Sequence, residues 1–339
     1  MRISLVFLLW VASFTAPAQD FSALDTYARN TPQAKAKNVD ELATYLHQQA
    51  ITDLEKVRAY YVWITQNIAY DTKSYFSGKS NPETSPEATL KKRRAICQGY
   101  SELFKALCDI GNIPCFVVDG YSKGYGYKPG KKFNSTDHAW NVVQLNQKWY
   151  LIDATWGAGY VTEQQQFEKK FKEEYFLADP KKFILNHLPS DPMWQLLPCP
   201  LTMEEYLEND PRIEKIIESK PDCFSFADTI NSYLQLEKAE RMINSSERAY
   251  RFFPENAEPV GYAYMNLAYD LGLQLTPLYD SEEFVKALEV SRTILQLNEK
   301  ALKYFKESKT GNGKNAYNMA KQNVASMKNS IKSLEDYLK

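Results

Sequence analysis

The chain has 339 residues, of which 44% are hydrophobic and 24% charged, and its formal net charge is −1. These proportions are those of globular domains, so they exclude a disordered chain and a bundle of membrane helices. A charge so close to neutral provides no basic field that would gather nucleic acid, and we expect no nucleic-acid partner. The length is sufficient for two domains.

Residues 1–18 have the pattern of a secretory signal peptide. Arg2 gives a short positive start, residues 3–14 are almost wholly apolar, and residues 16–18 (Ala-Pro-Ala) offer an A-x-A cleavage site. The apolar run is shorter than the about 20 residues that a membrane-spanning helix needs, and no later segment approaches that length. We therefore expect cleavage after Ala18, a secreted or periplasmic protein, and no integral membrane segment after cleavage. An uncleaved anchor is the alternative.

The N-terminal part of the mature chain is predicted to be helical. Residues 20–50 indicate one or two short helices. Thr52 and Glu55 have the spacing of a capping box, and apolar residues then recur at helical spacing, so a longer helix should begin here and end near Asp71. The stretch 72–89 is rich in Ser, Pro, Gly and Asn, which predicts a loop.

A second helix and three strands are predicted next. The helix begins at Cys97 and ends at Gly111, where a left-handed cap residue is usual. Runs typical of strands follow at 115–121, 138–145 and 148–155. Asn146 and Gln147 join the last two runs as a tight turn, so residues whose numbers sum to about 293 should face each other. A helix followed by antiparallel strands indicates an α+β domain, which we place at 19–206.

The last third of the chain is predicted to be helical. Strand signals stop near Leu207, and helical patterns cover 225–253, 260–272, 281–307 and 315–338. In the last two stretches the apolar spacing is typical of helices that pair along their length. We expect an α-helical C-terminal domain at 207–339 that ends in a long helical hairpin and offers a surface for a protein partner.

Three segments place reactive side chains beside aromatic residues or glycines. They are AICQGYSELF around Cys97, DHAWNVV around His138, and WYLIDATWG around Asp153. Cys97 starts a helix, where unpaired backbone N–H groups favour a thiolate. His138 could act as its base, and Asp153, diagonal to it on paired strands, could orient the imidazole. The alternative is that the three are only core and turn residues.

These segments, in this order, resemble the transglutaminase-like superfamily, and within it the kyphoscoliosis peptidase branch. The likeness runs from about residue 38 to 200 and includes YYVWITQNIAYDT before the cysteine and EEYFLADPKKF after the aspartate. It implies a papain-type core in which the nucleophile helix packs on an antiparallel sheet. It also implies a triad in which Cys97 is the nucleophile, His138 the base and Asp153 the orienting acid. The backbone N–H of Cys97 would supply one oxyanion donor.

The resemblance implies a thiol acyl-transfer enzyme that acts on a protein or peptide, and the signal-peptide pattern adds that it is exported. Hydrolysis of an amide is favoured over transfer to an amine, because the resemblance is to a peptidase branch. A non-catalytic scaffold or binding protein with the same fold is the alternative, with the C-terminal helices as its docking module. We expect no cofactor and no metal, since His47 and His187 are too isolated in the sequence to propose as metal ligands.

Aromatic and basic residues near the triad are further candidates. Trp63, Trp140 and Trp156 are the candidates for substrate binding, although a core role is favoured for Trp63. The basic run at 91–94 could attract an acidic substrate, but such a run before a helix is usually only solvated.

The other four cysteines are assigned structural roles. Cys108 and Cys115 lie on expected core faces. Cys199 and Cys223 could form a disulfide in an oxidising compartment, although the sequence cannot show whether their side chains meet.

Overall fold

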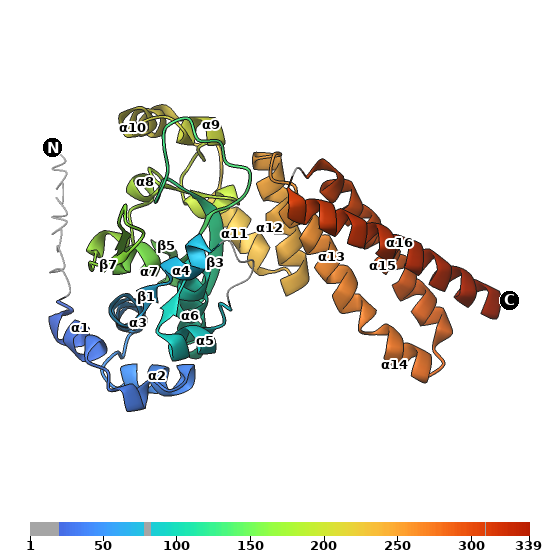
Figure 1. The fold of residues 1–339 in the computed structure, drawn as a ribbon, viewed down its shortest axis with the longest axis horizontal. Coiled ribbons are helices and arrows are strands. Elements are labelled where there is room, and N and C mark those ends of the chain that lie inside the picture. Colours follow the sequence, from blue (N-terminus) through green and yellow to red (C-terminus); the bar gives the residue numbers. More distant parts are fainter. Residues whose placement is uncertain (1–19, 78–82, 309) are drawn as a thin grey trace, which may run out of the picture.

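The computed structural model describes residues 20–77, 83–308 and 310–339. The predicted signal peptide, residues 1–18, lies outside these ranges. Figure 1 shows a rounded N-terminal region, coloured blue to green, from which an arm of orange and red helices extends. Within the described ranges, none of the helices combines the length and apolar character needed to cross a membrane.

The N-terminal part is helical, as predicted, with two short helices followed by a longer one. They are α1 (Ser22–Arg29), α2 (Val39–Leu46) and α3 (Asp53–Asn67). The predicted capping box at the start of α3 is confirmed, because the side chains of Thr52 and Glu55 each accept from the other residue's backbone N–H. Helix α3 ends at Asn67, earlier than predicted, because strand β1 (Ala69–Tyr70) pairs in parallel with β2 (Arg94–Ala95).

The prediction of a loop over 72–89 is wrong at both ends. Helix α4 (Thr72–Phe76) is capped by Asp71, whose side chain accepts from the Ser74 N–H. Helix α5 (Pro86–Lys92) is capped in the same way by Ser85. Polar residues and proline, which indicate loops in a sequence, are also the residues preferred at a helix start, and here they serve that purpose.

Helix α6 (Cys97–Ile110) packs on a four-stranded antiparallel sheet, and it begins at the predicted residue. In spatial order the strands are β5 (Lys148–Ile152), β4 (His138–Leu145), β3 (Cys115–Ser122) and β8 (His187–Pro189). The predicted register of β4 and β5 is confirmed by the pair Leu145 and Lys148. Asn146 and Gln147 have φ values of 49° and 63°, the left-handed conformation that a two-residue turn of this kind requires.

Two details of these elements differ from prediction. Strand β5 ends at Ile152 and not at residue 155, because Asp153 leaves the strand and caps the short helix α7 (Ala154–Ala158). Gly111 has a φ of −72°, and the left-handed residue after α6 is Asn112, with φ 56°. Asparagine tolerates that conformation because its short polar side chain can hydrogen-bond locally.

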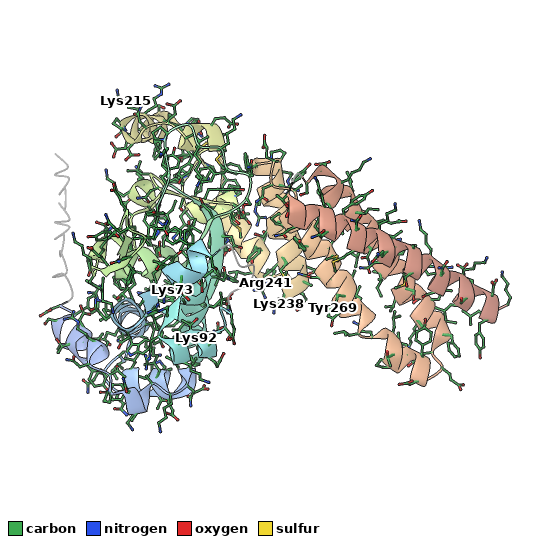
Figure 2. The ribbon with its side chains drawn as sticks, viewed as in Figure 1. Lys73, Lys92, Lys215, Lys238, Arg241 and Tyr269 are labelled. Carbon is green, nitrogen blue, oxygen red and sulfur yellow. A yellow bond between two sulfur atoms is a disulfide. The ribbon has the colours of Figure 1, made fainter. Side chains whose placement is uncertain are left out.

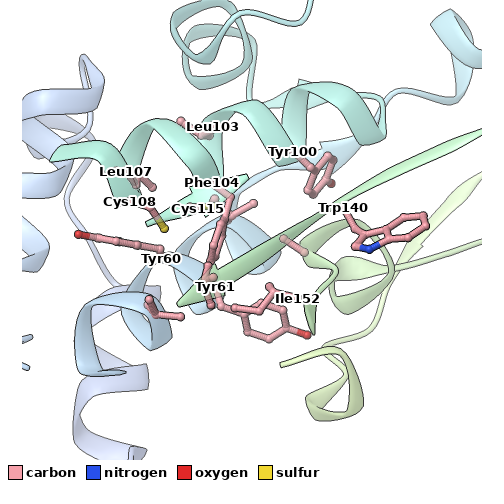
Figure 3. Packing of buried hydrophobic residues seen from close by; sticks show 14 of the residues in the cluster. Tyr60, Tyr61, Tyr100, Leu103, Phe104, Leu107, Cys108, Cys115, Trp140 and Ile152 are labelled. Carbon is pink, nitrogen blue, oxygen red and sulfur yellow. The ribbon is translucent and has the colours of Figure 1, made fainter. Parts of the chain in front are cut away.

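The main core lies between α3, α6 and the sheet. Figure 3 shows Tyr60, Tyr61, Tyr100, Phe104 and Trp140 of β4 in this one cluster, in which the rings of Tyr60 and Phe104 meet edge to face. Cys108 and Cys115 belong to the same cluster, as predicted. The α+β fold class, with a helix packed on an antiparallel sheet and helices following, is therefore confirmed.

Short elements complete this region. They are η1 (Gln33–Lys35), β6 (Gly159–Val161), β7 (Phe167–Lys169), η2 (Glu173–Tyr175), α8 (Pro180–Phe183), η3 (Pro192–Gln195), α9 (Met203–Tyr206) and α10 (Asp210–Ser219).

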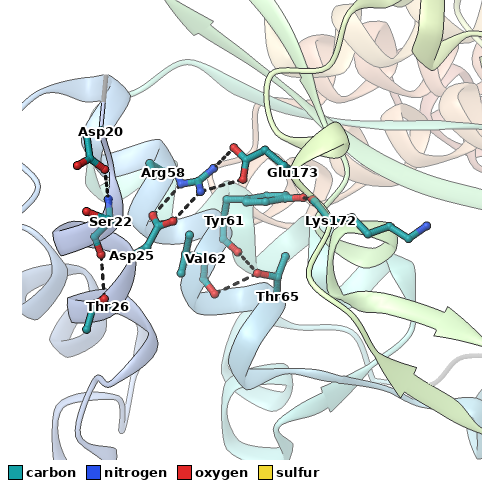
Figure 4. Close-up of polar contacts among 10 residues, drawn as sticks. All are labelled: Asp20, Ser22, Asp25, Thr26, Arg58, Tyr61, Val62, Thr65, Lys172 and Glu173. Carbon is teal, nitrogen blue, oxygen red and sulfur yellow. Dashed lines mark hydrogen bonds and ion pairs between the residues drawn. The ribbon is translucent and has the colours of Figure 1, made fainter. Parts of the chain in front are cut away.

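Arg58 joins α3, on which it lies, to α1 and to η2 (Figure 4). Its guanidinium contacts Asp25 of α1, at 2.8 Å from Nε to Oδ1, and Glu173 of η2, at 2.9 Å from Nη2 to Oε2. The hydroxyl of Tyr61 donates to the Lys172 carbonyl oxygen in the same segment. Because the N–H of Asp153 in turn donates to the Tyr175 carbonyl, this network supports the chain where Asp153 lies.

The C-terminal region is helical, as predicted. Its helices are α11 (Phe226–Leu234), α12 (Lys238–Phe252), α13 (Glu258–Gly272), α14 (Leu275–Asp280), α15 (Phe284–Glu307) and α16 (Gly311–Tyr337). The predicted hairpin is formed by α15 and α16, which lie side by side (Figure 1). The stretch 225–253 is two helices and not one. The domain boundary near Leu207 stays a prediction, and α10, which follows it, packs Ile213 against Tyr206 and Leu188.

Several contacts join the C-terminal helices to the N-terminal region, among them the packing of Tyr233 of α11 on Phe116 and Trp194. Cys199 and Cys223 form a disulfide, which resolves the pairing that the sequence left open. Arg248 of α12 forms an ion pair with Asp191, which lies just after β8. Elsewhere charged side chains such as Lys215 point outward (Figure 2).

Candidate active site

Tertiary structure brings the three predicted triad residues together. Cys97 is the first residue of α6, His138 the first residue of β4, and Asp153 the N-cap of α7. His138 Nε2 lies 2.8 Å from Asp153 Oδ2, and Cys97 lies near enough to the His138 ring to raise its pKa. Both His138 and Asp153 are buried, at 7% and 0% exposure, whereas Cys97 is partly exposed. Cys97 is therefore the member of the three with the most exposed surface, and the Asp153 carboxylate is closed to a substrate.

The His138 ring is oriented by its two partners. Because Nε2 is engaged with Asp153, Nδ1 is the ring nitrogen that remains for the Cys97 sulfur. The two nitrogens therefore have different surroundings, since Nε2 faces the carboxylate that holds the ring and Nδ1 is left for another partner.

The charged forms of His138 and Asp153 stabilise each other. Burial disfavours the charged imidazole, but attraction to Asp153 and hydrogen bonds with Asp153 and Cys97 outweigh it and raise the pKa of His138 to about 10. Burial also disfavours the Asp153 carboxylate, yet attraction to His138 and hydrogen bonds from His138 and His187 hold its pKa far below the ordinary value. Near neutral pH the pair is therefore an imidazolium and a carboxylate.

The Asp153 carboxylate is surrounded by four hydrogen-bond donors. Oδ1 accepts from the backbone N–H groups of Thr155 and Trp156, at 2.8 and 3.0 Å. Oδ2 accepts from His138 and also from His187, whose Nε2 lies 3.0 Å away. A wholly buried carboxylate is stable only when its lone pairs are satisfied in this way.

His187 is a site residue that the sequence reasoning missed, and the description of it as isolated is wrong. It begins β8, whose pairing with β3 places Ser122 opposite His187. Each of His138, Asp153 and His187 offers one atom that could ligate a metal ion, and these atoms lie within 4.8 Å of one another. They are buried and already hydrogen-bonded to one another, an arrangement that also fits a proton relay. The absence of a metal stays a prediction. His47, by contrast, contacts Tyr60.

A cavity of about 250 Å³ opens beside His138. Its aromatic lining residues include Tyr70, Tyr75, Tyr125, Trp156, Tyr160 and Tyr175. The charged residues in its wall have partners within the protein. Asp137 accepts from the Ser122 N–H at 2.7 Å, and Lys123 donates to the Glu208 carbonyl at 3.0 Å. Both residues also form ion pairs, Asp137 with Lys131 at 3.2 Å and Lys123 with Asp210 at 3.9 Å, so the wall is mainly aromatic and these two charges are paired.

Of the three tryptophans proposed for substrate binding, only Trp156 lines this cavity. Trp63 and Trp140 have no exposed surface. Trp63 lies in the core beneath the Arg93 guanidinium, which is centred 4.6 Å from its ring, so this member of the basic run is not simply solvated. Trp140 packs against the rings of His138 and His187, at 5.8 and 5.2 Å, and so supports the site from below.

The chain contains a transglutaminase-like domain: residues 40–154 match the model of the transglutaminase-like superfamily. Curated relatives place that domain in the kyphoscoliosis peptidase-like branch. The chain is 40% identical over 200 residues to the kyphoscoliosis peptidase of Homo sapiens, covering 58% of this chain and 30% of that protein. It is 30% identical over 217 residues to Hillarin of Drosophila melanogaster, covering 60% of this chain and 26% of that protein. The chain thus spans less than a third of these relatives' length.

Solved structures also match in part. A candidate cysteine protease from Cytophaga hutchinsonii is 25% identical, with a TM-score of 0.27 over 36% of this chain and 39% of that chain. A structure described as a TGase is 18% identical, with a TM-score of 0.27 over 49% of this chain and 38% of that chain. At these TM-scores we draw no argument from the likeness.

Proposed function

We propose that this protein is an exported thiol acyl-transfer enzyme that hydrolyses amide or peptide bonds in a protein or peptide substrate. The observation that carries the proposal is the buried His138–Asp153 pair beside the partly exposed Cys97 at the start of α6. A protonated imidazole next to the sulfur and the unpaired N–H groups of a helix start both favour a thiolate.

The chemistry follows from these positions. The Cys97 thiolate attacks the amide carbonyl carbon, and the carbonyl electron pair moves to the oxygen, which the Cys97 backbone N–H can stabilise. The C–N bond then breaks as His138 transfers its proton to the departing amine, leaving a thioester on Cys97. Water attacks the thioester while His138 accepts its proton, and the carboxylic product leaves with the thiolate restored.

The cavity beside His138 supports a substrate site next to the imidazole, and Cys97 itself is not among the residues that line it. The segment 122–136, which could have filled it, provides one wall, while Phe133 packs away against Tyr121 and Tyr206. This leaves room beside His138 for a substrate. We favour hydrolysis of the thioester over transfer to an amine because the chain is similar to a peptidase branch.

Export is supported by two features. Residues 1–18 have the composition of a signal peptide, with a positive start, an apolar run and a small-residue cleavage site. The Cys199–Cys223 disulfide is of the kind that persists in oxidising compartments.

Alkylation of Cys97 by iodoacetamide, measured against pH, tests the proposal. Within the described residues Cys97 is the free cysteine with exposed surface, because Cys108 and Cys115 are buried, and Cys97→Ser provides the blank. An ordinary thiol reacts mainly above about pH 8.5. We expect rapid reaction below pH 7 in the native protein, and loss of that reactivity in His138→Ala.

The matched control is His47→Ala, which removes a histidine at the end of α2 and should leave the alkylation profile unchanged. A native Cys97 that is inert, or that reacts equally well without His138, would contradict the enzyme and favour the scaffold.

A further inference from the structure

A second histidine shares the carboxylate oxygen that holds His138. His187 Nε2 lies 3.0 Å from Asp153 Oδ2, and His138 Nε2 lies 2.8 Å from the same atom. His187 has no exposed surface, so solvent and substrate do not reach it. Its position is therefore suited to acting on Asp153 and not on the substrate.

The fold holds the His187 ring in a fixed orientation. Strand β8 pairs with β3, which fixes its backbone. The ring stacks on Phe183, with centroids 4.0 Å apart and planes 20° from parallel, and contacts Trp156 at 4.3 Å. Such close aromatic packing leaves the imidazole little freedom to rotate.

The protonation of His187 follows from its partner. An ionised carboxylate only accepts hydrogen bonds, so Nε2 of His187 must carry a proton. Burial outweighs the contacts with Asp153 and lowers the pKa of His187 to about 4, so the ring is neutral near pH 7. The Asn186 side-chain oxygen lies 2.5 Å from Nδ1, so a neutral ring with Nε2–H requires that amide to turn its N–H₂ group toward Nδ1. The other groups that face the ring are His138 and Tyr175, whose pKa burial raises.

We propose that His187 is a positioning residue of the triad, a neutral donor that fixes the Asp153 carboxylate so that Oδ2 faces His138. It acts through Asp153 and does not touch the reacting atoms. The backbone N–H groups of Thr155 and Trp156 hold Oδ1. His187 holds Oδ2 in the position where this oxygen also accepts from His138. This role rests on the proposed function, because it concerns the same triad.

Two substitutions separate the hydrogen bond from the packing. His187→Phe keeps an aromatic ring against Phe183 and removes the donor. His187→Gln loses the ring, but its amide N–H₂ can reach the position of Nε2. His47→Phe is the matched control, since it removes a histidine whose Nε2 contacts one side-chain oxygen, that of Tyr60, away from the triad.

The first readout is ¹⁵N-histidine NMR, because the chain contains three histidines and each gives separate signals. In the native protein we expect His187 to be the neutral Nε2–H form and His138 to show the proton of a strong hydrogen bond to Asp153. That His138 proton signal should shift or broaden in His187→Phe, return in His187→Gln and be unaffected in His47→Phe. A native His187 protonated only at Nδ1 would overturn the proposal without any variant.

The second readout is Cys97 alkylation between pH 5 and 9. A hydrogen bond to a charged group corresponds to a change of about 10- to 100-fold in rate if it is lost in the reactive state. We expect a loss of that size at pH 6 to 7 in His187→Phe, with most of it regained in His187→Gln.

The outcomes distinguish the two proposals. If His187→Phe keeps the native His138 signal and alkylation rate, or if His187→Gln is impaired as much as His187→Phe, the residue serves packing alone and the positioning role is wrong. If native Cys97 is unreactive while the His138 signal still depends on the donor at 187, the enzyme proposal fails and the positioning role stands.

Discussion

Replacing Arg248 by methionine should show how strongly the C-terminal helices are joined to the region that carries the site. Asp191 lies two residues after β8 and is 2% exposed. Arg248 Nε and Nη2 donate to its two oxygens, each at 2.7 Å. Ser245 Oγ donates to Oδ2 at 2.7 Å. Methionine keeps most of the apolar stem of arginine and removes the charge and both donors.

The magnitude follows from this burial. Removing one partner of a buried pair destabilises a protein by about 3–5 kcal/mol, because the other charge is left buried without compensation. The Arg248 side chain is only 13% exposed, so solvent screens the pair little. Since the Ser245 hydroxyl and the Met193 N–H still donate to Asp191, we expect about 3 kcal/mol, the lower end of that range.

Urea unfolding, followed by tryptophan fluorescence, measures the loss. The control is Lys182→Met, which breaks the pair with Glu214 at the same distance of 2.7 Å but with side chains 72% and 45% exposed. An exposed pair contributes at most about 1 kcal/mol. Adding Asp191→Asn to Arg248→Met should restore part of the stability, because the uncompensated charge is gone. A loss in Arg248→Met no larger than that in Lys182→Met would refute the reasoning.

Two further predictions concern the site and the helix beside it. In Asp153→Asn the pKa of His138 should fall from about 10 towards its ordinary 6.5, so rapid Cys97 alkylation at pH 7 should be lost. The raised pKa of His138 stabilises the native fold fully below pH 6.5, and this is lost as pH rises through 10. The fall in urea midpoint between pH 7 and 10 should therefore be smaller in the variant, and an unchanged fall would contradict the assignment. Gly157→Ala in α7 should lower stability by about 1–3 kcal/mol, because the new methyl would collide with the Tyr61 hydroxyl. Gly272→Ala, where nothing lies within 4 Å, should be neutral or stabilising by up to about 1 kcal/mol in the same unfolding assay.

Local rules account for what could be predicted from the sequence. The Thr52 and Glu55 capping box and the Asn146–Gln147 turn each depend on residues within a few positions of one another. The turn then fixed the register of β4 and β5, because a two-residue connection allows little choice of pairing. The start of α6 at Cys97 followed from helical periodicity in the same way.

The same rules gave wrong boundaries where one residue type has two uses. The apolar and aromatic residues before Asp153 predict that it continues the strand, yet its carboxylate caps α7. Asp71 and Ser85 indicate a loop in the sequence and are helix caps in the structure. In each case a polar side chain can form a hydrogen bond either with solvent or with a backbone N–H at the start of a helix. The local sequence does not show which of the two bonds forms.

By itself, the sequence determined the order of the longer elements, α3, α6, β3, β4, β5 and the C-terminal helices, and pointed to the three residues of the candidate triad, because periodicity, caps and flanking motifs are local. Only the tertiary structure decided what meets Asp153. His187 is 34 positions away and reaches the carboxylate because β8 pairs with β3. Arg248 is 57 positions from Asp191, and Cys199 is 24 from Cys223. Contacts across such separations depend on how the packed elements are arranged in space, and this arrangement cannot be inferred from the spacing of residues along the chain.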